Sequence, residues 1–248
     1  MMGIKTFSSW NIRQQDNEEQ VEPYRRYFFI CEGANTERWY FEKLIERRKD
    51  LGIHPLIDLC LLEKTEEDKN ITYPMQLIDF AEKQKSAPEI SFDEERDQMI
   101  IVFDADIFER KVEDYDNVVQ YGEEKKNILG VTNPSFELFL LLHCDKAWKE
   151  LIEPNVEKIL KNEKRGNNRE IYWILHEKIK INCKKNSKIG ELASNLDIAI
   201  KQEKNINQDV HVCIGQLTSN IGKIIESIQQ DNLEKISALR ICRKGRGR

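Results

Sequence analysis

The sequence predicts an α/β protein with a mostly parallel central sheet flanked by helices and a helical lobe towards the C-terminus. Three observations lead to this prediction. Short, almost wholly apolar runs at residues 27–31 and 99–103 are typical of strands covered on both faces. Segments with helical spacing of apolar residues follow these runs, as crossover units between parallel strands require. Beyond residue 145, helical patterns dominate.

The first part of the chain is predicted to alternate strands with helices. The buried strand Tyr27–Cys31 leads into a turn and a helix, for which Thr36 is the expected N-cap and Gly52 the stop. A second strand is expected over residues 56–62. Pro74 then stands at the first turn of the next helix, where its missing N–H costs nothing.

The clearest strand, Met99–Phe103, is β-branched and apolar, and it ends abruptly at Asp104-Ala105-Asp106. The elements expected after it are a polar helix over 112–125, a short strand over 128–131, a turn at Asn133-Pro134-Ser135 and an apolar helix over 136–144.

The predicted C-terminal lobe is mainly helical, and parts of it, residues 161–169 and 178–188, are locally basic. Its expected elements are helices over 155–162, 169–181, 190–203 and 218–229 and one strand over 210–214. The chain is therefore divided into a flexible N-terminal arm (1–24), an α/β core (25–145), the helical lobe (146–239) and a basic tail (240–248).

Composition narrows the classes of function. The 248 residues carry 44 acidic and 39 basic side chains, a net charge of −5, which argues against binding nucleic acid through bulk positive charge. Because the tail Arg240–Arg248 holds five of the cations, the rest of the chain carries −10. A nucleic-acid substrate would then be held by a metal ion, by local basic patches or by a partner.

No apolar run approaches the ~18 residues that a bilayer helix needs, and the N-terminus has no secretory apolar core. The six cysteines form no C-x-x-C pair and mostly stand among apolar neighbours, so buried reduced thiols are favoured over disulfides or a zinc site. These features predict a cytoplasmic protein without a membrane segment.

Acidic side chains stand where buried strands end. Glu32 directly follows the first strand, and Asp104 and Asp106 end the clearest one. Their i, i+2 spacing places both aspartates on the same side if the chain stays extended. Because open parallel sheets place ligands at the carboxyl ends of their strands, these three acids are expected to converge. Glu137, in the first turn of the apolar helix, is a fourth candidate.

Carboxylates gathered in one place repel each other unless a cation neutralises them. Hard oxygen donors without nearby histidine or cysteine favour Mg²⁺ or Mn²⁺ over zinc. Such an ion orients a phosphate and activates water in phosphoryl chemistry. Each acid alone also has an ordinary interpretation, as a solvated turn residue or, for Glu137, as a residue that favours the helix dipole.

The motifs around these acids resemble those of the RloB-like family. Cys31-Glu32-Gly33 with Thr36-Glu37 and Tyr40-Phe41 matches its opening C-E-G-x-x-T-E-x-x-Y-F segment, and Phe103–Asp106 matches its D-x-D. Asn133–Leu138, running into Leu140–His143, resembles its N-P-x-F-E-x-[WF]-L-L-L-H block. Residues 218–228 weakly resemble its closing helix. The resemblance spans residues 27–228.

The resemblance implies a Toprim-like fold, shared with topoisomerases, primases and overcoming-lysogenization-defect nucleases. It implies a magnesium-dependent endonuclease acting in prokaryotic antiphage, abortive-infection defence, beside an ATPase of the structural-maintenance type. Carried onto this chain, Glu32 would ligate metal or act as general acid/base, Asp104 and Asp106 would be paired metal ligands, and Glu137 would be a further acid of the catalytic site.

One departure concerns a second metal ion. Family members often carry another acid directly after the D-x-D, whereas this chain has Ile107 and Phe108 before Glu109. Glu109 or Glu137 would have to help to hold a second ion, so one- and two-metal mechanisms both stay open.

Several other residues have two interpretations. Lys184 and Lys185 stand where relatives carry a basic residue, and they are candidate phosphate contacts or part of a solvated face. His143 is expected to be a buried structural histidine rather than a catalytic one. Trp39 and Tyr40 are expected in the core, with base stacking as the alternative.

Two functions of different classes remain. The first is a metal-dependent nuclease, for which the resemblance favours RNA such as tRNA over DNA. The second is a regulatory or docking subunit of an ATPase defence complex, with weak or absent catalysis. Nucleotidyl transfer finds no support because the chain has no glycine-rich phosphate loop. A homodimer is left open.

Overall fold

The structure is a computed structural model that describes residues 6–8, 23–64, 68 and 71–231. Its centre is a six-stranded sheet in the order β1-β3-β2-β4-β5-β8. The inner strands are parallel to one another, and the two edge strands are antiparallel to their neighbours. The strands are β1 (Thr6–Ser8), β2 (Arg25–Cys31), β3 (Ile57–Leu62), β4 (Gln98–Asp104), β5 (Ile128–Asn133) and β8 (Thr218–Ser219). The predicted α/β fold with a mostly parallel sheet is confirmed.

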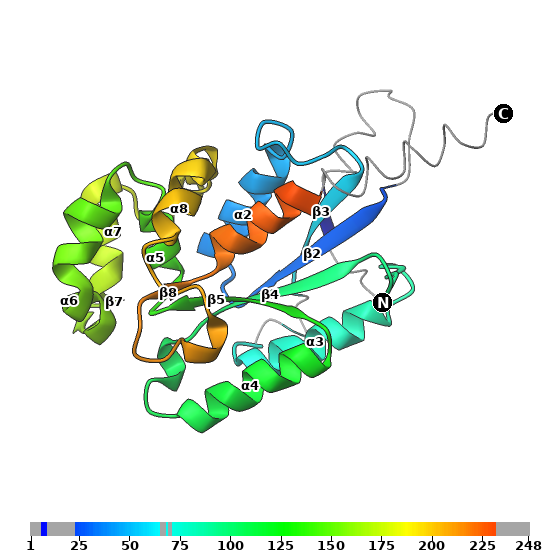
Figure 1. The fold of residues 1–248 in the computed structure, drawn as a ribbon, viewed down its shortest axis with the longest axis horizontal. Coiled ribbons are helices and arrows are strands. Elements are labelled where there is room, and N and C mark those ends of the chain that lie inside the picture. Colours follow the sequence, from blue (N-terminus) through cyan, green and yellow to red (C-terminus); the bar gives the residue numbers. More distant parts are fainter. Residues whose placement is uncertain (1–5, 9–22, 65–67, 69–70, 232–248) are drawn as a thin grey trace.

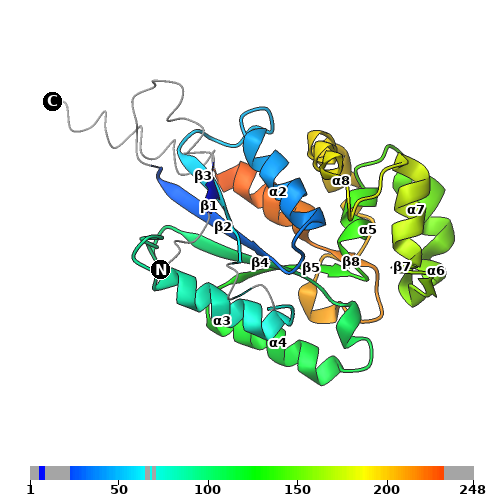
Figure 2. The same ribbon diagram turned by 180° about the vertical axis from the view of Figure 1, so that it is seen from behind.

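Helices cover both faces of this sheet, as Figure 1 and, from behind, Figure 2 show. One face carries α3 and α4, and the other carries α2 and the C-terminal helix, which includes residues 221–231. The remaining helices and a small hairpin form a lobe beside the sheet. The bounds are α2 (Thr36–Glu46), α3 (Pro74–Lys85), α4 (Val112–Glu124), α5 (Phe136–Leu141), α6 (Val156–Lys161), β6 (Lys164–Arg165), β7 (Asn168–Arg169), α7 (Glu170–Ile179) and α8 (Leu196–Glu203).

Strand residues alternate between two buried clusters, one on each face of the sheet. In β2, Tyr27 and Phe29 belong to the cluster under α2, while Phe28 and Ile30 belong to the cluster over α3 and α4. Both sets are buried, which is why the strand reads as a continuous apolar run. Burying each such side chain contributes about 1.5–3 kcal/mol, so both layers stabilise the sheet.

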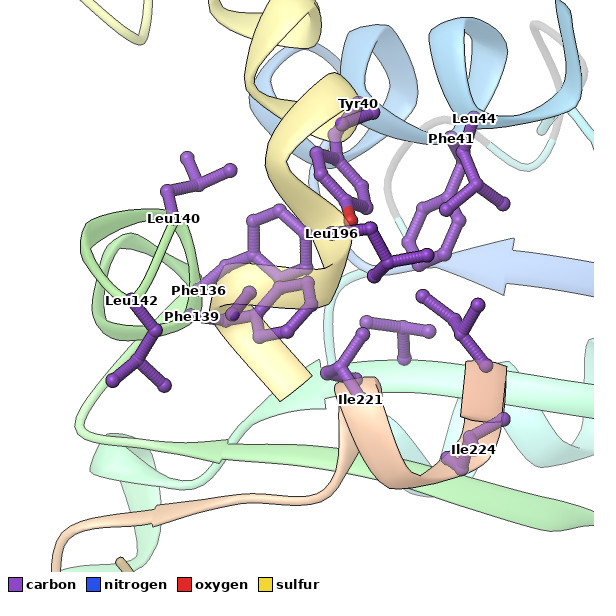
Figure 3. Close-up of a cluster of buried hydrophobic side chains, with 14 of the residues drawn as sticks. Tyr40, Phe41, Leu44, Phe136, Phe139, Leu140, Leu142, Leu196, Ile221 and Ile224 are labelled. Carbon is purple, nitrogen blue, oxygen red and sulfur yellow. The ribbon is translucent and has the colours of Figure 1, made fainter. Parts of the chain in front are cut away.

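The larger cluster joins the helical lobe to the sheet. Figure 3 shows Tyr40 and Phe41 of α2 facing Phe136 and Phe139 of α5. Tyr40 meets Phe139 edge-on with ring centroids 5.5 Å apart. Ile221 of the C-terminal helix packs against the same cluster. Elements from three distant parts of the chain therefore share one core.

Chain order and spatial order differ at one point of the sheet. The four parallel strands lie in the order β3-β2-β4-β5, so the first and third of them are neighbours. The helix after β2 covers one face, and the helix after β4 covers the other. This divergence is a topological switch point, where open α/β sheets leave a crevice at the carboxyl ends of the strands.

Some local predictions were wrong. Thr36 is the first residue of α2 rather than its N-cap, which is Asn35, and the Thr36 hydroxyl donates a hydrogen bond to the carbonyl of Cys183 (3.1 Å). Residues 210–212 form a 3₁₀ turn, not a strand. The last predicted helix begins only after β8, because Thr218–Ser219 pair with β5.

The first and last segments take part in the sheet. Within the predicted arm, Thr6–Ser8 pair antiparallel with β3 as an edge strand. Residues 218–231, assigned to the helical lobe from the sequence, contribute β8 and a helix that packs on the core. The basic tail lies outside the described residues. Cys31, Cys60, Cys144, Cys183 and Cys213 are free and buried, as predicted, and Cys242 lies outside the described residues.

The described helices include none that is both long enough and apolar enough to span a bilayer.

The C-terminal helix is held at its start by a buried acid. Glu203, at the end of α8, is fully buried. Its carboxylate accepts hydrogen bonds from the Ser219 hydroxyl (2.6 Å), the backbone N–H groups of Gly222 (3.0 Å) and Lys223 (2.8 Å), and the Gln208 amide (2.9 Å). The N–H groups in the first turn of a helix have no partner within the helix, so Glu203 caps this one.

Candidate acidic active site

An open pocket of about 310 Å³ lies at the switch point of the sheet. Acidic side chains and two cations line it: Glu37, Asp104, Asp106, Glu137, Arg169 and Lys184. The acids come from the end of β4 and the first turns of α2 and α5, and the cations come from β7 and the segment after α7. Figure 1 shows that the carboxyl ends of β2, β4 and β5 face the helical lobe that supplies these cations.

Glu32 follows β2 as predicted, but it does not line the pocket. Its carboxylate lies beside the wall and accepts a hydrogen bond from the backbone N–H of Asp104 (3.3 Å). Its own carbonyl accepts from the ammonium of Lys64 (2.5 Å). Burial, with repulsion from Asp106, raises the pKa of Glu32 to about 6, and the bond from Asp104 and attraction to Lys64 oppose that rise.

Asp104 and Asp106 both line the pocket, although not by the predicted route. The strand ends at Asp104, and the chain then turns into a short 3₁₀ helix that begins at Asp106. The pair is therefore brought to one side by a turn and not by extended backbone. The Thr132 hydroxyl, on neighbouring β5, donates to Asp104 Oδ1 (2.6 Å) and fixes that carboxylate.

Glu137 lies in the first turn of α5, as predicted. The hydroxyl of Ser135, the N-cap residue, donates to Glu137 Oε2 (2.6 Å), while Oε1 lies 4.0 Å from the ammonium of Lys184. The carboxylate is thus oriented by its own helix start and faces the same pocket as Asp104.

Glu37 belongs to this site and was not among the predicted site residues. It stands in the first turn of α2, and its carboxylate lies against the backbone of Gly33, where a Cβ would come within 2.0 Å of Glu37 Oε2. Glycine at position 33 allows this close approach. The signal was present in the sequence, because Glu37 is part of the motif that contains Glu32.

The acids raise one another's pKa values. Burial raises the pKa of Glu37 to about 7, and repulsion from Glu137 and Glu32 adds to the rise. Burial also raises the pKa of Asp104 well above its ordinary value, with contributions from Glu37 and Glu137. Burial is the first cause for Asp106 too, and Arg169 opposes the rise. Such mutual shifts show that the carboxylates act as one electrostatic cluster.

Cations surround the cluster at its rim and behind it. The Arg169 guanidinium lies 3.4 Å from Asp106, and the Lys64 ammonium is half-buried behind Glu32. Of the two predicted phosphate contacts, Lys184 lines the pocket, whereas Lys185 is exposed and does not. Glu109 is exposed and outside the pocket, although its charge contributes to the raised pKa of Asp106.

His143 is a structural residue. It is fully buried, its Nδ1 donates to the carbonyl of Phe139 (2.9 Å), and its Nε2 accepts from the Tyr40 hydroxyl (3.0 Å). Burial lowers the pKa of His143 to about 4, so the ring is neutral. Tyr40 is fully buried and Trp39 packs against the core, in agreement with the predicted packing roles.

Comparison with known protein families shows which family this chain belongs to. The model of the RloB-like protein family matches residues 27–228, which include every acid of the pocket. The chain belongs to the RloB-like protein family. No curated protein and no solved structure gives a significant match.

The donor set of this RloB-like pocket suits a hard divalent cation. It offers several carboxylates whose pKa values are raised by burial and, to a smaller extent, by repulsion from one another, and oxygen donors of this kind are the ligands that Mg²⁺ and Mn²⁺ prefer. As the side chains stand, the described residues form no group of three or more His, Cys, Asp or Glu that could hold an ion. Asp104 and Asp106, with Glu32 beside them, would therefore need side-chain rotation to bind one.

The raised pKa values predict how the stability of the RloB-like chain depends on pH. The pKa values of Glu32 and Glu37 rise from 4.5 to about 6 and about 7, so across this window the folded chain holds more protons than the unfolded chain. Their contribution to the free energy of unfolding therefore falls as pH rises from 4.5 to 7. Glu37→Gln should raise that free energy more at about pH 8 than at about pH 5.

The measurement is urea unfolding of both proteins in EDTA at the two pH values. Glu157→Gln, at an exposed position of α6, is the matched control and should show no such difference. A Glu37→Gln effect that is the same at both pH values would contradict the shifted pKa.

Proposed function

We propose that this RloB-like chain is a Toprim-type, metal-dependent endonuclease that cleaves phosphodiester bonds in RNA such as tRNA, or else in DNA. The observation that carries the proposal is the convergence of Glu32, Glu37, Asp104, Asp106 and Glu137 at the switch point of a parallel sheet. Structural ion pairs do not require such a cluster, whereas divalent-metal chemistry on phosphates does.

Each group has a role that its position supports. A bound Mg²⁺ or Mn²⁺ would supply charge compensation at the scissile phosphate. Asp104 and Asp106 would hold the ion, with Glu32 as a third ligand. The pKa of Glu37, about 7, suits it to accept a proton from a water or hydroxyl nucleophile at neutral pH. Glu137 orients Lys184, whose ammonium would contact the phosphate.

The biological role rests on the family. The RloB-like resemblance supports action as an effector of antiphage abortive-infection defence, controlled by an ATPase partner of the structural-maintenance type. A charge of −5 on the chain supports a substrate held by the metal site and local cations rather than by bulk attraction.

One observation favours a second candidate, a regulatory or docking subunit with weak or absent catalysis. In the described part of the chain the acids do not stand in position to ligate a metal ion together. In that case the pocket would serve the fold or a partner, and a divalent ion would not raise the melting temperature.

Incubating the purified chain with Mg²⁺ and labelled tRNA, single-stranded RNA, single-stranded DNA and duplex DNA separates the two candidates. We expect the wild type to cut at least one substrate, and Glu32→Gln to lose that cleavage because the neutral amide cannot replace the carboxylate. The control is Glu177→Gln, at an exposed position of α7. If the wild type and Glu32→Gln gave the same products, the nuclease proposal would fail.

A further inference from the structure

A basic hairpin stands at the rim of the acidic pocket and has no role in the chemistry described above. It consists of residues 164–169, in which β6 and β7 pair antiparallel. Lys164, Arg165 and Arg169 are its charged residues; all three are exposed, and the segment contains no acid. The chain as a whole has a net charge of −5, so this segment is positively charged within an acidic protein.

The hairpin is held in place by its own lobe. Trp173 of α7 donates its indole N–H to the carbonyl of Arg165 (3.0 Å), and the Arg165 guanidinium lies over the same indole ring at 5.4 Å. Arg169 donates to the carbonyl of Asn162 (3.3 Å). Arg165 therefore has a structural partner in the lobe, and Lys164 is an exposed residue.

Arg169 links the hairpin to the acids. Its guanidinium lies 3.4 Å from Asp106, yet its side chain remains 51% exposed. An exposed ion pair of this kind contributes only about 0–1 kcal/mol, so Arg169 can exchange this partner for a phosphate at little cost. A guanidinium is also the side chain best shaped to bind phosphate oxygens through two N–H groups.

A second basic segment follows α7 in the chain. Residues 180–188 include Lys180, Lys184, Lys185 and Lys188, all exposed, and no acid. This segment is fastened to the start of α2, because the Thr36 hydroxyl donates to the carbonyl of Cys183 (3.1 Å). Since Lys184 and Arg169 line the same pocket, cations from both segments border the acids.

We propose that the basic hairpin is a binding surface for the phosphodiester backbone of a polynucleotide strand, and that Arg169 positions the strand over the acidic pocket. The inference rests on the proposed function for the chemical class of the ligand and adds the surface that binds it. Phosphate contacts of this kind set the position of a strand without reading its sequence. The surface also explains how an acidic chain can retain an anionic substrate.

Binding can be measured without any cleavage. Fluorescence anisotropy in EDTA, with labelled single-stranded RNA and DNA of equal sequence, compares the wild type with Lys164→Gln/Arg169→Gln. We expect about tenfold weaker binding, and a smaller slope of log K against log salt by about 1.4, for the loss of two phosphate contacts on a single strand. Arg165 is kept because it packs on Trp173.

The matched control is Lys49→Gln/Lys83→Gln, which removes two exposed lysines outside the pocket and the hairpin. It should bind like the wild type, and Arg169→Lys should retain most of the salt dependence. Melting temperatures show that each variant is folded. Equal losses in the hairpin variant and the control, or no binding by the wild type, would overturn the inference.

The outcome is separable from that of the proposed function. Hairpin-dependent binding without any metal-dependent cleavage would retain the binding surface and reject the nuclease. Cleavage by the wild type together with unchanged binding by the hairpin variant would support the nuclease and reject the hairpin as the binding surface. The RNA and DNA probes show which backbone the surface prefers.

Discussion

Asp104→Asn should lower metal-dependent cleavage by about 10²–10³-fold, the loss that follows removal of one preorganised electrostatic group. Asp104 lies at the centre of the cluster, where its carboxylate is fixed by the Thr132 hydroxyl (2.6 Å) and interacts with Glu32, Glu37 and Glu137. The asparagine keeps the shape and can still accept the bond from Thr132. It removes the negative charge that would hold a cation.

The same substitution should not lower stability in EDTA at about pH 8. Burial and its acidic neighbours raise the pKa of Asp104, so its charged form opposes folding, and a neutral isostere relieves that repulsion. Cleavage is followed by gel assay, and stability by urea unfolding. Asp116→Asn, at an exposed position of α4, is the matched control.

These two readouts separate a site from a structural role. A variant that loses cleavage while it keeps or gains stability supports a functional acid. Asp104→Asn that cleaves like the wild type would contradict the assignment, and so would a loss of activity explained wholly by unfolding.

Glu203→Ala should lower the free energy of unfolding by about 3–5 kcal/mol, because several donors lose their acceptor and each unsatisfied buried donor costs about 1–3 kcal/mol. The substitution leaves the hydroxyl of Ser219 and the N–H groups of Gly222 and Lys223 without their acceptor. These groups belong to the junction between β8 and the C-terminal helix, which packs on the sheet. Losing the cap therefore weakens the core as well as the helix.

Urea unfolding at about pH 7 measures this loss. Glu203→Gln keeps one acceptor oxygen and should lose less than the alanine variant. Glu177→Ala, exposed on α7, should stay within about 0.5 kcal/mol of the wild type. A Glu203→Ala protein as stable as the wild type would show that Glu203 is not the cap.

The sheet could be predicted because its inner strands are buried on both faces. A strand that is buried on both faces needs apolar residues at every position. Residues 27–31 and 99–103 are uninterrupted apolar runs of this kind, and both are strands. β8 has no such signal, since it is only two residues long and depends on a distant partner. There the Asn220 side chain completes the pairing by accepting from Val131 N–H (2.7 Å) and donating to the Leu129 carbonyl (2.8 Å). Long-range hydrogen bonds of this kind cannot be predicted from the spacing of apolar residues in the sequence.

The acids of the site were predictable for the same topological reason. Glu32, Asp104 and Glu137 follow strands or start helices at one edge of the sheet, and the structure brings them together there. Glu37 belongs to the same motif as Glu32, but its position in the pocket against Gly33 is a three-dimensional contact that residue spacing does not show. Arg169 was missed because its neighbour Asp106 is far away in the chain.

The carboxylates at the switch point are expected to bind a divalent cation. Calorimetric titration of the metal-free chain with Mn²⁺ at about pH 8, for the wild type and Asp104→Asn, measures this binding. We expect saturable binding by the wild type that weakens as pH falls below the pKa of Glu32, about 6, and loss of binding in the variant. No saturable binding by the wild type, or equal binding by Asp104→Asn, would contradict it.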